Sequence, residues 1–279
     1  MRAANLVVSL LGVAGVVVAA VLAWRWRDKP LRVARPTTVT TSASAALDGV
    51  RTLAVAVSAG AIAGVLVPGL GGRLVMRILG AASGRAAQGS ATEAEEIVGE
   101  ITTSGTLGVI IFVGLLGGVF AALVFVVVGR WLPATAGRAG AITGVLLLGS
   151  IGVGDAMSPD NRDFAILRPI WLAVTLIVGL ALLFGVTFTA LVARLDAGMP
   201  TLSRRPSSIA SHAGLIVFAF PVLFVGAAAY VAGRAVLRGR LALVFATPIA
   251  QRVGHTILGA ATVFASFTSI WAISEIVTA

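Results

Sequence analysis

The sequence predicts an all-α, polytopic helical integral membrane protein, in which about seven transmembrane helices form one bundle. Long apolar runs fill most of the 279 residues, of which 58% are hydrophobic and only 11% are charged. A bilayer core about 30 Å thick needs roughly 20 apolar residues of helix, and most of the runs reach that length. The runs are also uninterrupted, whereas the strands of a membrane β-barrel alternate polar and apolar side chains. These observations favour helices in lipid over a soluble domain or a barrel.

The first element is a transmembrane helix within residues 1–24, followed over 25–51 by a basic cytoplasmic loop and a Pro-, Ser- and Thr-rich linker. A membrane helical bundle then fills residues 52–279. Its spans lie near 52–72, 107–129, 139–156, 169–193, 213–233 and 253–274. The span near 139–156 is the shortest. Residues 234–252 hold only a short apolar stretch, which favours a re-entrant or interfacial segment over a further span.

The predicted orientation rests on the loop after the first span. Six cationic side chains lie in it: Arg25, Arg27, Lys29, Arg32, Arg35 and Arg51. Loops rich in Lys and Arg stay in the cytoplasm, which places the amino terminus outside. Seven spans then place the carboxyl terminus in the cytoplasm, and we expect the protein in the cell (inner or plasma) membrane. All five tryptophans lie beside span ends, as is typical of aromatic rings at the headgroup level.

The second span carries the most unusual local sequence. Its apolar run is interrupted by Pro68, Gly69, Gly71 and Gly72, and is then followed by Arg73 and Arg77. Because proline lacks a backbone N–H and glycine loosens a helix, the sequence favours a break between Pro68 and Gly72. A restarted helix would present free N–H groups beside the arginines, which predicts an anion or lipid-headgroup site at these glycines and arginines. Alternatively, the span ends at Gly72 and the arginines extend to the headgroups.

The loop after the second span is acidic. It contains two overlapping capping boxes, which predict a short external helix that begins near Ser90 or Thr92. Three carboxylates would share one face of that helix: Glu93, Glu96 and Glu100. These three are candidate charge partners of the two arginines in the second span. A solvated acidic face and a cation site are the alternatives.

Nothing in the sequence predicts a catalytic, metal or cofactor site. The chain has no cysteine, and its two histidines lie far apart, so no metal-ligand spacing results. Residues 152–155, Gly-Val-Gly-Asp, are similar to the motif around one catalytic aspartate of intramembrane aspartyl proteases. That chemistry needs a second carboxylate at the same site, and no other span interior contains an aspartate. We therefore expect a protein that is not an enzyme.

Two functions lead after these exclusions, ahead of membrane enzymes and lipid-binding proteins. Glycine pairs at four-residue spacing occur in three spans and favour close helix packing: Gly60 and Gly64, Gly114 and Gly118, Gly140 and Gly144. They predict a helical subunit or scaffold that packs with itself or with partner membrane proteins. The alternative is a carrier or channel for a small anionic or amphiphilic solute that uses the broken second span. Membrane lipid is an expected partner, and nucleic acid is not, because a net charge of +10 is ordinary for loops at a membrane surface.

Overall fold

The computed structural model describes most of the chain, and helices dominate it. The described residues are 2–31, 42–93, 97–98, 100, 102–154, 156–200, 212, 228–233 and 247–278. Within these ranges there is no β-sheet, and only two isolated β-bridges occur. Most of the predicted linker, most of the predicted span at 213–233, and most of the segment at 234–252 lie outside the described residues. The fold is therefore all-α, as predicted.

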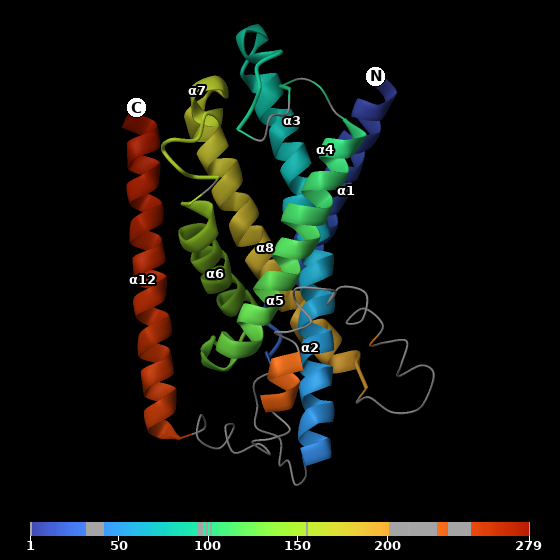
Figure 1. Ribbon diagram of the computed structural model, residues 1–279, viewed down its shortest axis with the longest axis vertical. Helices are drawn as coiled ribbons and strands as arrows, with labels where there is room; N and C mark the ends of the chain where they lie inside the picture. Colours follow the sequence, from blue (N-terminus) through green and yellow to red (C-terminus); the bar gives the residue numbers. More distant parts are fainter. Residues whose placement is uncertain are drawn as a thin grey trace.

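The helical segments run alternately up and down the molecule (Figure 1). In that view α1 descends, α2 to α3 ascend, α4 to α5 descend, α6 ascends, α8 descends and α12 ascends. We call the two ends of the bundle in this view the upper and the lower end. The bounds are α1 Arg2–Trp26, α2 Ser42–Gly64, η1 Val65–Gly71, α3 Gly72–Ala82, α4 Thr103–Gly108, η3 Val109–Leu116, α5 Gly117–Val128, α6 Ala136–Leu147, η5 Leu148–Gly152, α7 Asp163–Ile166, α8 Ile170–Gly198 and α12 Pro248–Thr278. Short 3₁₀ turns cover Arg85–Ala87 (η2) and Gly129–Trp131 (η4).

Five helical segments are long and apolar enough to cross a membrane, in agreement with five of the predicted spans. They are Leu6–Trp26, Ala45–Ala82, Thr103–Trp131, Ile170–Gly198 and Pro248–Thr278. Charged residues bracket them at suitable distances. For example, residues 52–72 between Arg51 and Arg73 form about 31 Å of helix, which is close to the thickness of a bilayer core. These helices are compatible with a multi-pass membrane protein, whereas the predicted count of about seven spans is not confirmed.

Both termini lie at the upper end of the bundle (Figure 1). This differs from the predicted topology, which places the two termini on opposite sides. Within the described residues, the five long segments and the shorter pair α6 and η5 give an even number of passes. The predicted short span near 139–156 corresponds to that pair, Ala136–Gly152.

The second span is a single continuous helix, so the predicted break between Pro68 and Gly72 is wrong. The residues on both sides of η1, Gly64 and Gly72, have right-handed helical angles. Seven residues of η1 adopt the π-helical pattern, in which a carbonyl accepts from the N–H five residues ahead. In this pattern the donor to the Gly64 carbonyl is the N–H of Gly69. In an α-helix the donor would be residue 68, and Pro68 has no N–H. The helix also does not end at Gly72, because α3 continues to Ala82.

Close glycine contacts join the helices of the core. A Cβ atom on Gly64 would collide with the carbonyl oxygen of Gly114, and one on Gly60 with that of Gly118. The predicted glycine pairs of the second and third spans therefore face each other. The third pair, in α6, meets α8 in the same way, because a Cβ on Gly140 would collide with the backbone of Val186 in α8. Such contacts let helix backbones approach one another in lipid, where apolar burial gives no driving force.

Aromatic packing and a partly buried ion pair complete the core on the lower side. The rings of Phe125 and Phe188 meet edge to face, with centroids 5.1 Å apart. Nearer the lower end, Arg51 Nη1 lies 2.7 Å from Asp196 Oδ1. Arg51 also donates to the backbone oxygens of Asp196 at 2.6 Å and Met199 at 2.9 Å, at the carboxyl end of α8. A cation at this position satisfies carbonyls that the helix leaves without partners.

The helices α1 and α12 lie at the periphery. In each of them, only 22% of the most apolar 18-residue stretch is buried. The helix α12 touches the bundle through one stripe of mostly small residues: Gly254, Leu258, Ala265, Ser269, Ala272 and Ile276. Its remaining faces carry exposed aromatic side chains, including Phe264, Phe267 and Trp271. In a membrane protein such faces contact lipid or other membrane proteins.

Candidate functional site

The upper end of the bundle carries a folded cap made of residues 83–102 and 156–169. The first part begins with Gly84 and Gly89, whose positive φ angles of 70° and 85° turn the chain. Backbone hydrogen bonds then pair Gly89 N with Val98 O at 3.0 Å and Val98 N with the Ser90 oxygen at 2.9 Å. A β-bridge joins Ala91 to Ile97. The predicted short helix beginning near Ser90 or Thr92 is therefore wrong, because the chain folds back on itself there.

Hydrogen bonds join the two parts of the cap to each other and to α3. The Glu93 backbone N–H donates to Asp163 Oδ1 at 2.8 Å. The Arg168 backbone N–H donates to Ser83 Oγ at 2.8 Å, and Ser83 lies directly after α3. The Gln88 side chain donates to the Gly80 carbonyl at 2.8 Å. These bonds fix the cap above the second span.

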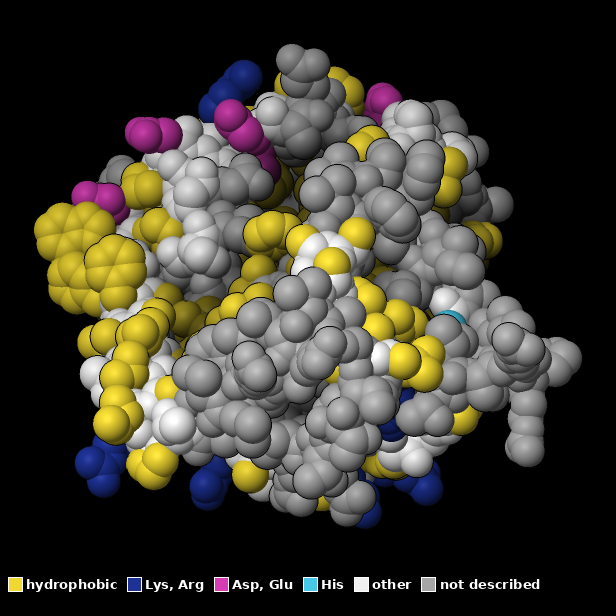
Figure 2. All heavy atoms as spheres, turned by 60° about the horizontal axis from the view of Figure 1, so that its bottom comes forward, with side chains coloured by type: hydrophobic (Ala, Val, Ile, Leu, Met, Phe, Trp, Pro, Cys, Tyr) yellow, Lys and Arg dark blue, Asp and Glu magenta, His cyan; other side chains and the backbone are white. Residues whose placement is uncertain are grey.

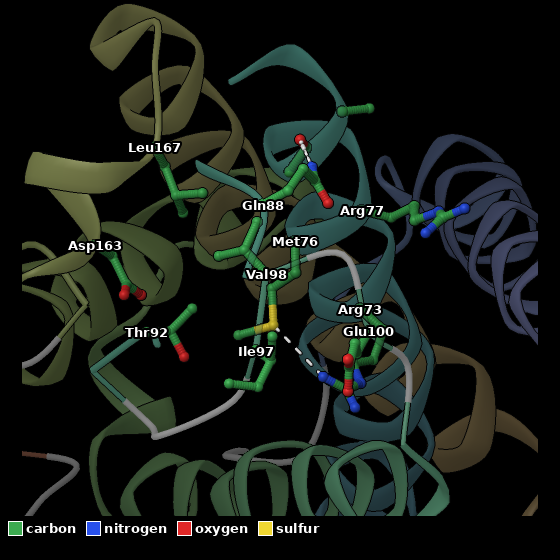
Figure 3. Close-up of a pocket in the computed structure, with 12 residues that line it drawn as sticks. Arg73, Met76, Arg77, Gln88, Thr92, Ile97, Val98, Glu100, Asp163 and Leu167 are labelled. Atoms are coloured by element: carbon green, nitrogen blue, oxygen red, sulfur yellow. Dashed lines mark hydrogen bonds between the residues drawn. The ribbon is translucent and has the colours of Figure 1, made fainter. Parts of the chain in front are cut away.

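A cavity of about 320 Å³ lies between α3, the 88–100 segment and α7, and it is our candidate site. Figure 3 shows Asp163 and Thr92 on one side of it, Arg73 on the other, and Met76 and Ile97 between them. The complete lining is Arg73, Met76, Arg77, Gly80, Ala81, Gln88, Thr92, Ile97, Val98, Glu100, Asp163 and Leu167. The site therefore combines apolar walls with two arginines and two carboxylates.

Arg73 is built into the wall of the cavity. It is only 7% exposed. Its Nε and Nη2 atoms lie 3.3 and 3.1 Å from Thr106 Oγ1, and its Nη1 lies 3.7 Å from Met76 Sδ. Thr106 Oγ1 in turn donates to the Thr102 carbonyl at 2.8 Å, at the start of α4. The guanidinium is thus held between the second and third spans.

Arg77 and Glu100 also line the cavity, as the predicted pairing of these charges requires. Figure 3 shows the Arg77 side chain directed away from Met76 and Ile97, toward α1. Within the described residues, neither the Arg77 guanidinium nor the Glu100 carboxylate forms a hydrogen bond or an ion pair. The structure therefore brings Arg73, Arg77 and Glu100 to one cavity but does not join Glu100 to either arginine.

The other predicted site residues have different positions. Gly69 and Gly71 are buried within the π-helical turn, where Cβ atoms would meet Ile110 Cα at 3.4 Å and Leu180 Cδ1 at 3.0 Å. The Gly72 N–H is bonded to carbonyls of its own helix. These glycines therefore serve helix packing, and they present no free N–H groups to an anion. Glu93 faces α7 instead of the cavity, and Glu96 lies outside the described residues.

Several lining residues carried no signal in the sequence. Asp163, the first residue of α7, reaches the cavity from a position ninety residues after Arg73 in the chain. Met76 and Gln88 belong to no motif, and Thr92 is part of a predicted capping box, not of a predicted site. Only the folding of the cap brings Gln88 and Thr92 beside α3. Asp155, in the segment that is similar to the protease motif, lies outside the described residues. Among the residues that the structure does describe, no group of His, Asp and Glu side chains could hold a metal ion.

No protein-family model matches the chain, and neither a curated protein nor a solved structure matches it. The chemistry of the site must therefore be argued from the geometry alone. The site holds fixed charges of both signs and apolar surface at the membrane boundary. Such a site can bind a ligand that is itself both charged and partly apolar.

Proposed function

We propose that the protein is a non-catalytic, multi-pass helical subunit of the cell membrane, which packs with itself or with partner membrane proteins through the outer face of α12. The supporting observation is the way in which α12 packs against the bundle. One stripe of mostly small residues contacts the bundle, and the exposed faces carry Phe264, Phe267 and Trp271, which are 68%, 62% and 57% exposed. Aromatic side chains of this kind are frequent anchors at protein interfaces.

The orientation that we propose follows the charges. Figure 2, which turns the lower end toward the viewer, shows Lys and Arg side chains along the lower rim and most of the visible Asp and Glu side chains along the upper rim. The lower end of the bundle includes the basic residues at the end of α1 and directly after it, Arg25, Arg27 and Lys29. Basic ends face the cytoplasm, so the lower end would be cytoplasmic and both termini would lie outside.

The mass of the protein in lipid nanodiscs tests the subunit function. We expect a homo-oligomer or a stoichiometric complex after gentle extraction. Phe267→Ala should release the partner, because it removes an exposed anchor of α12. The matched control is Phe120→Ala on α5, where an aromatic ring is 50% exposed on another face. A stable monomer with unchanged mass in every preparation would contradict the proposal.

A second candidate function is a carrier or channel for a small anionic or amphiphilic solute. The observation that favours it is the position of Arg73 and Arg77, which line a cavity at the boundary of the bilayer. Saturable uptake into reconstituted vesicles tests this function. Arg73→Gln should reduce uptake, whereas uptake that Arg73→Gln leaves unchanged would reject this cavity as the site.

A further inference from the structure

An open furrow of about 750 Å³ lies at the lower end of α1, at the opposite end of the bundle from the cavity beside Arg73. The described residues that line it belong to α1 and the two residues that follow: Val17, Ala20, Val21, Trp24, Arg25, Arg27 and Asp28. Its wall changes from apolar to charged over about 12 Å of helix, from Val17 to Arg25. Tryptophan rings gather at the headgroup level of a bilayer, so this change at Trp24 coincides with the boundary of the hydrocarbon layer.

Two contacts position Arg27 in the wall of this furrow. Its guanidinium carbon lies over the Trp24 ring, 3.6 Å from the ring centre, in a cation–π contact. Its backbone carbonyl accepts from the Gly137 N–H at 2.7 Å, at the start of α6. The guanidinium is therefore held in place before any ligand binds, which lowers the entropic cost of binding.

Most of the hydrogen-bond donors of Arg27 are available to a ligand. Its Nε donates to Asp28 Oδ2 at 3.3 Å, whereas its Nη1 and Nη2 form no hydrogen bond within the described residues. Arg25 forms neither a hydrogen bond nor an ion pair in that part of the chain. The Asp28 side chain is 89% exposed, so its pairing with Arg27 is weak. With two arginines against one carboxylate, the furrow suits an anion.

We propose that this furrow binds one anionic phospholipid, with its phosphate at Nη1 and Nη2 of Arg27 and an acyl chain along Val17 and Val21. The planar fork of a guanidinium matches two phosphate oxygens. Both valines and Trp24 are exposed, so they offer apolar surface to the chain. The furrow and the lipid also share one order of groups, because the acyl chain lies deeper in the membrane than the phosphate. The positive charge favours a lipid without an ammonium group, such as phosphatidylglycerol.

Native mass spectrometry of the full-length protein, released from detergent, tests this site with dioleoyl phosphatidylglycerol as the probe. We expect one tightly bound molecule, and at least tenfold weaker binding of dioleoyl phosphatidylcholine. Arg27→Gln should weaken binding of phosphatidylglycerol by roughly tenfold, because it removes the charged donors. Trp24→Leu keeps the wall apolar and both arginines in place, and it should weaken binding severalfold because the ring beneath Arg27 is lost. Asp28→Asn should strengthen binding severalfold, since it removes the competing carboxylate, and misfolding cannot produce such a gain.

A matched control separates this site from general surface charge. Arg252→Gln changes an exposed arginine near the start of α12, at the same end of the bundle and outside the lining of the furrow. It should leave binding unchanged, and each variant should keep the melting temperature of the parent protein. Glycerol phosphate, which has no acyl chains, should bind far more weakly than the lipid. Equal binding of the two lipids, equal losses for Arg27→Gln and Arg252→Gln, or binding of glycerol phosphate as tight as that of the lipid would overturn the proposal.

Discussion

At the scale of single residues, glycine and arginine carry much of the fold. Glycine at Gly60, Gly64 and Gly140 lets backbones touch where any side chain would collide. Arg51 joins the start of the second span to the end of α8, with its side chain 20% exposed and that of Asp196 10% exposed. The contribution of each glycine or arginine to the fold depends on where it lies in the structure. The same residue types lie elsewhere in other surroundings: Gly259 faces open space, and the Arg27 side chain is 43% exposed and lies over the Trp24 ring.

Gly64→Val should destabilise the protein strongly. The added side chain would collide with the Gly114 carbonyl, so the second and third spans must move apart. We expect the apparent melting temperature in detergent to fall by roughly 5 °C or more, which corresponds to about 2 kcal/mol. Gly259→Val is the control, because nothing lies within 4 Å of a Cβ at that position. Equal melting temperatures for the two variants would show that the glycine contact does not set the helix spacing.

Arg51→Met should cost about 1 to 3 kcal/mol, because it leaves the largely buried Asp196 carboxylate and two backbone oxygens without their donor. Thermal unfolding in detergent measures this loss. The matched control is Arg27→Met, which removes an exposed pair with Asp28 and should change the melting temperature little. If both variants unfold at the same temperature, the Arg51 interaction contributes no more than a surface pair.

At the scale of elements, packing overrides local propensity. The sequence predicted the five long spans because composition and length alone identify them. It did not predict that the second helix continues through Pro68, since the compensating contacts come from neighbouring helices such as η3 and α8. It also predicted a helix that begins near Ser90 or Thr92 and carries Glu93 and Glu100, where capping boxes compete with chain reversal at Gly89. The lining of the cavity depends on that reversal, so only part of the site was accessible from the sequence.

Ala265→Leu should loosen α12 from the bundle. Ala265 is 5% exposed and lies against Gly149 in η5, so a larger side chain has no room there. We expect a lower melting temperature and faster proteolysis of the segment before α12. The control is Val263→Leu, at a position that is 71% exposed on the opposite side of the helix. Identical proteolysis patterns for both variants would argue against the small-residue stripe as the contact that seats α12.

At the scale of the whole molecule, the bundle is asymmetric from end to end. The upper end carries a folded cap, both termini and the candidate cavity, and the lower end carries the Arg51 ion pair and the basic residues after α1. Apolar runs in a sequence identify candidate spans, but they do not show in which direction the last of these spans, α12, crosses the bundle. The direction of α12 is visible only in the structure, which places the end of α12 at the same end of the bundle as the start of α1.

Cysteine labelling tests this arrangement cleanly, because the natural chain has no cysteine. Cysteines introduced near the two ends, at Ala3 and at Ala279, should react with a membrane-impermeant maleimide from the same side of intact cells or sealed vesicles. A cysteine at Asp28, at the lower end, should react only after the membrane is opened. Labelling of the two termini from opposite sides would contradict the bundle in Figure 1.

The π-helical turn of η1 has a consequence for the direction of everything that follows it. Each residue advances an α-helix by about 100°, so widening the turns by one residue rotates the next segment by that angle relative to the preceding one. The turn therefore sets the azimuth of α3, and with it the side on which Arg73 and Met76 emerge. A helix one residue shorter, for instance after deletion of Leu66, would keep the same composition and a similar length, yet its cavity wall would point elsewhere.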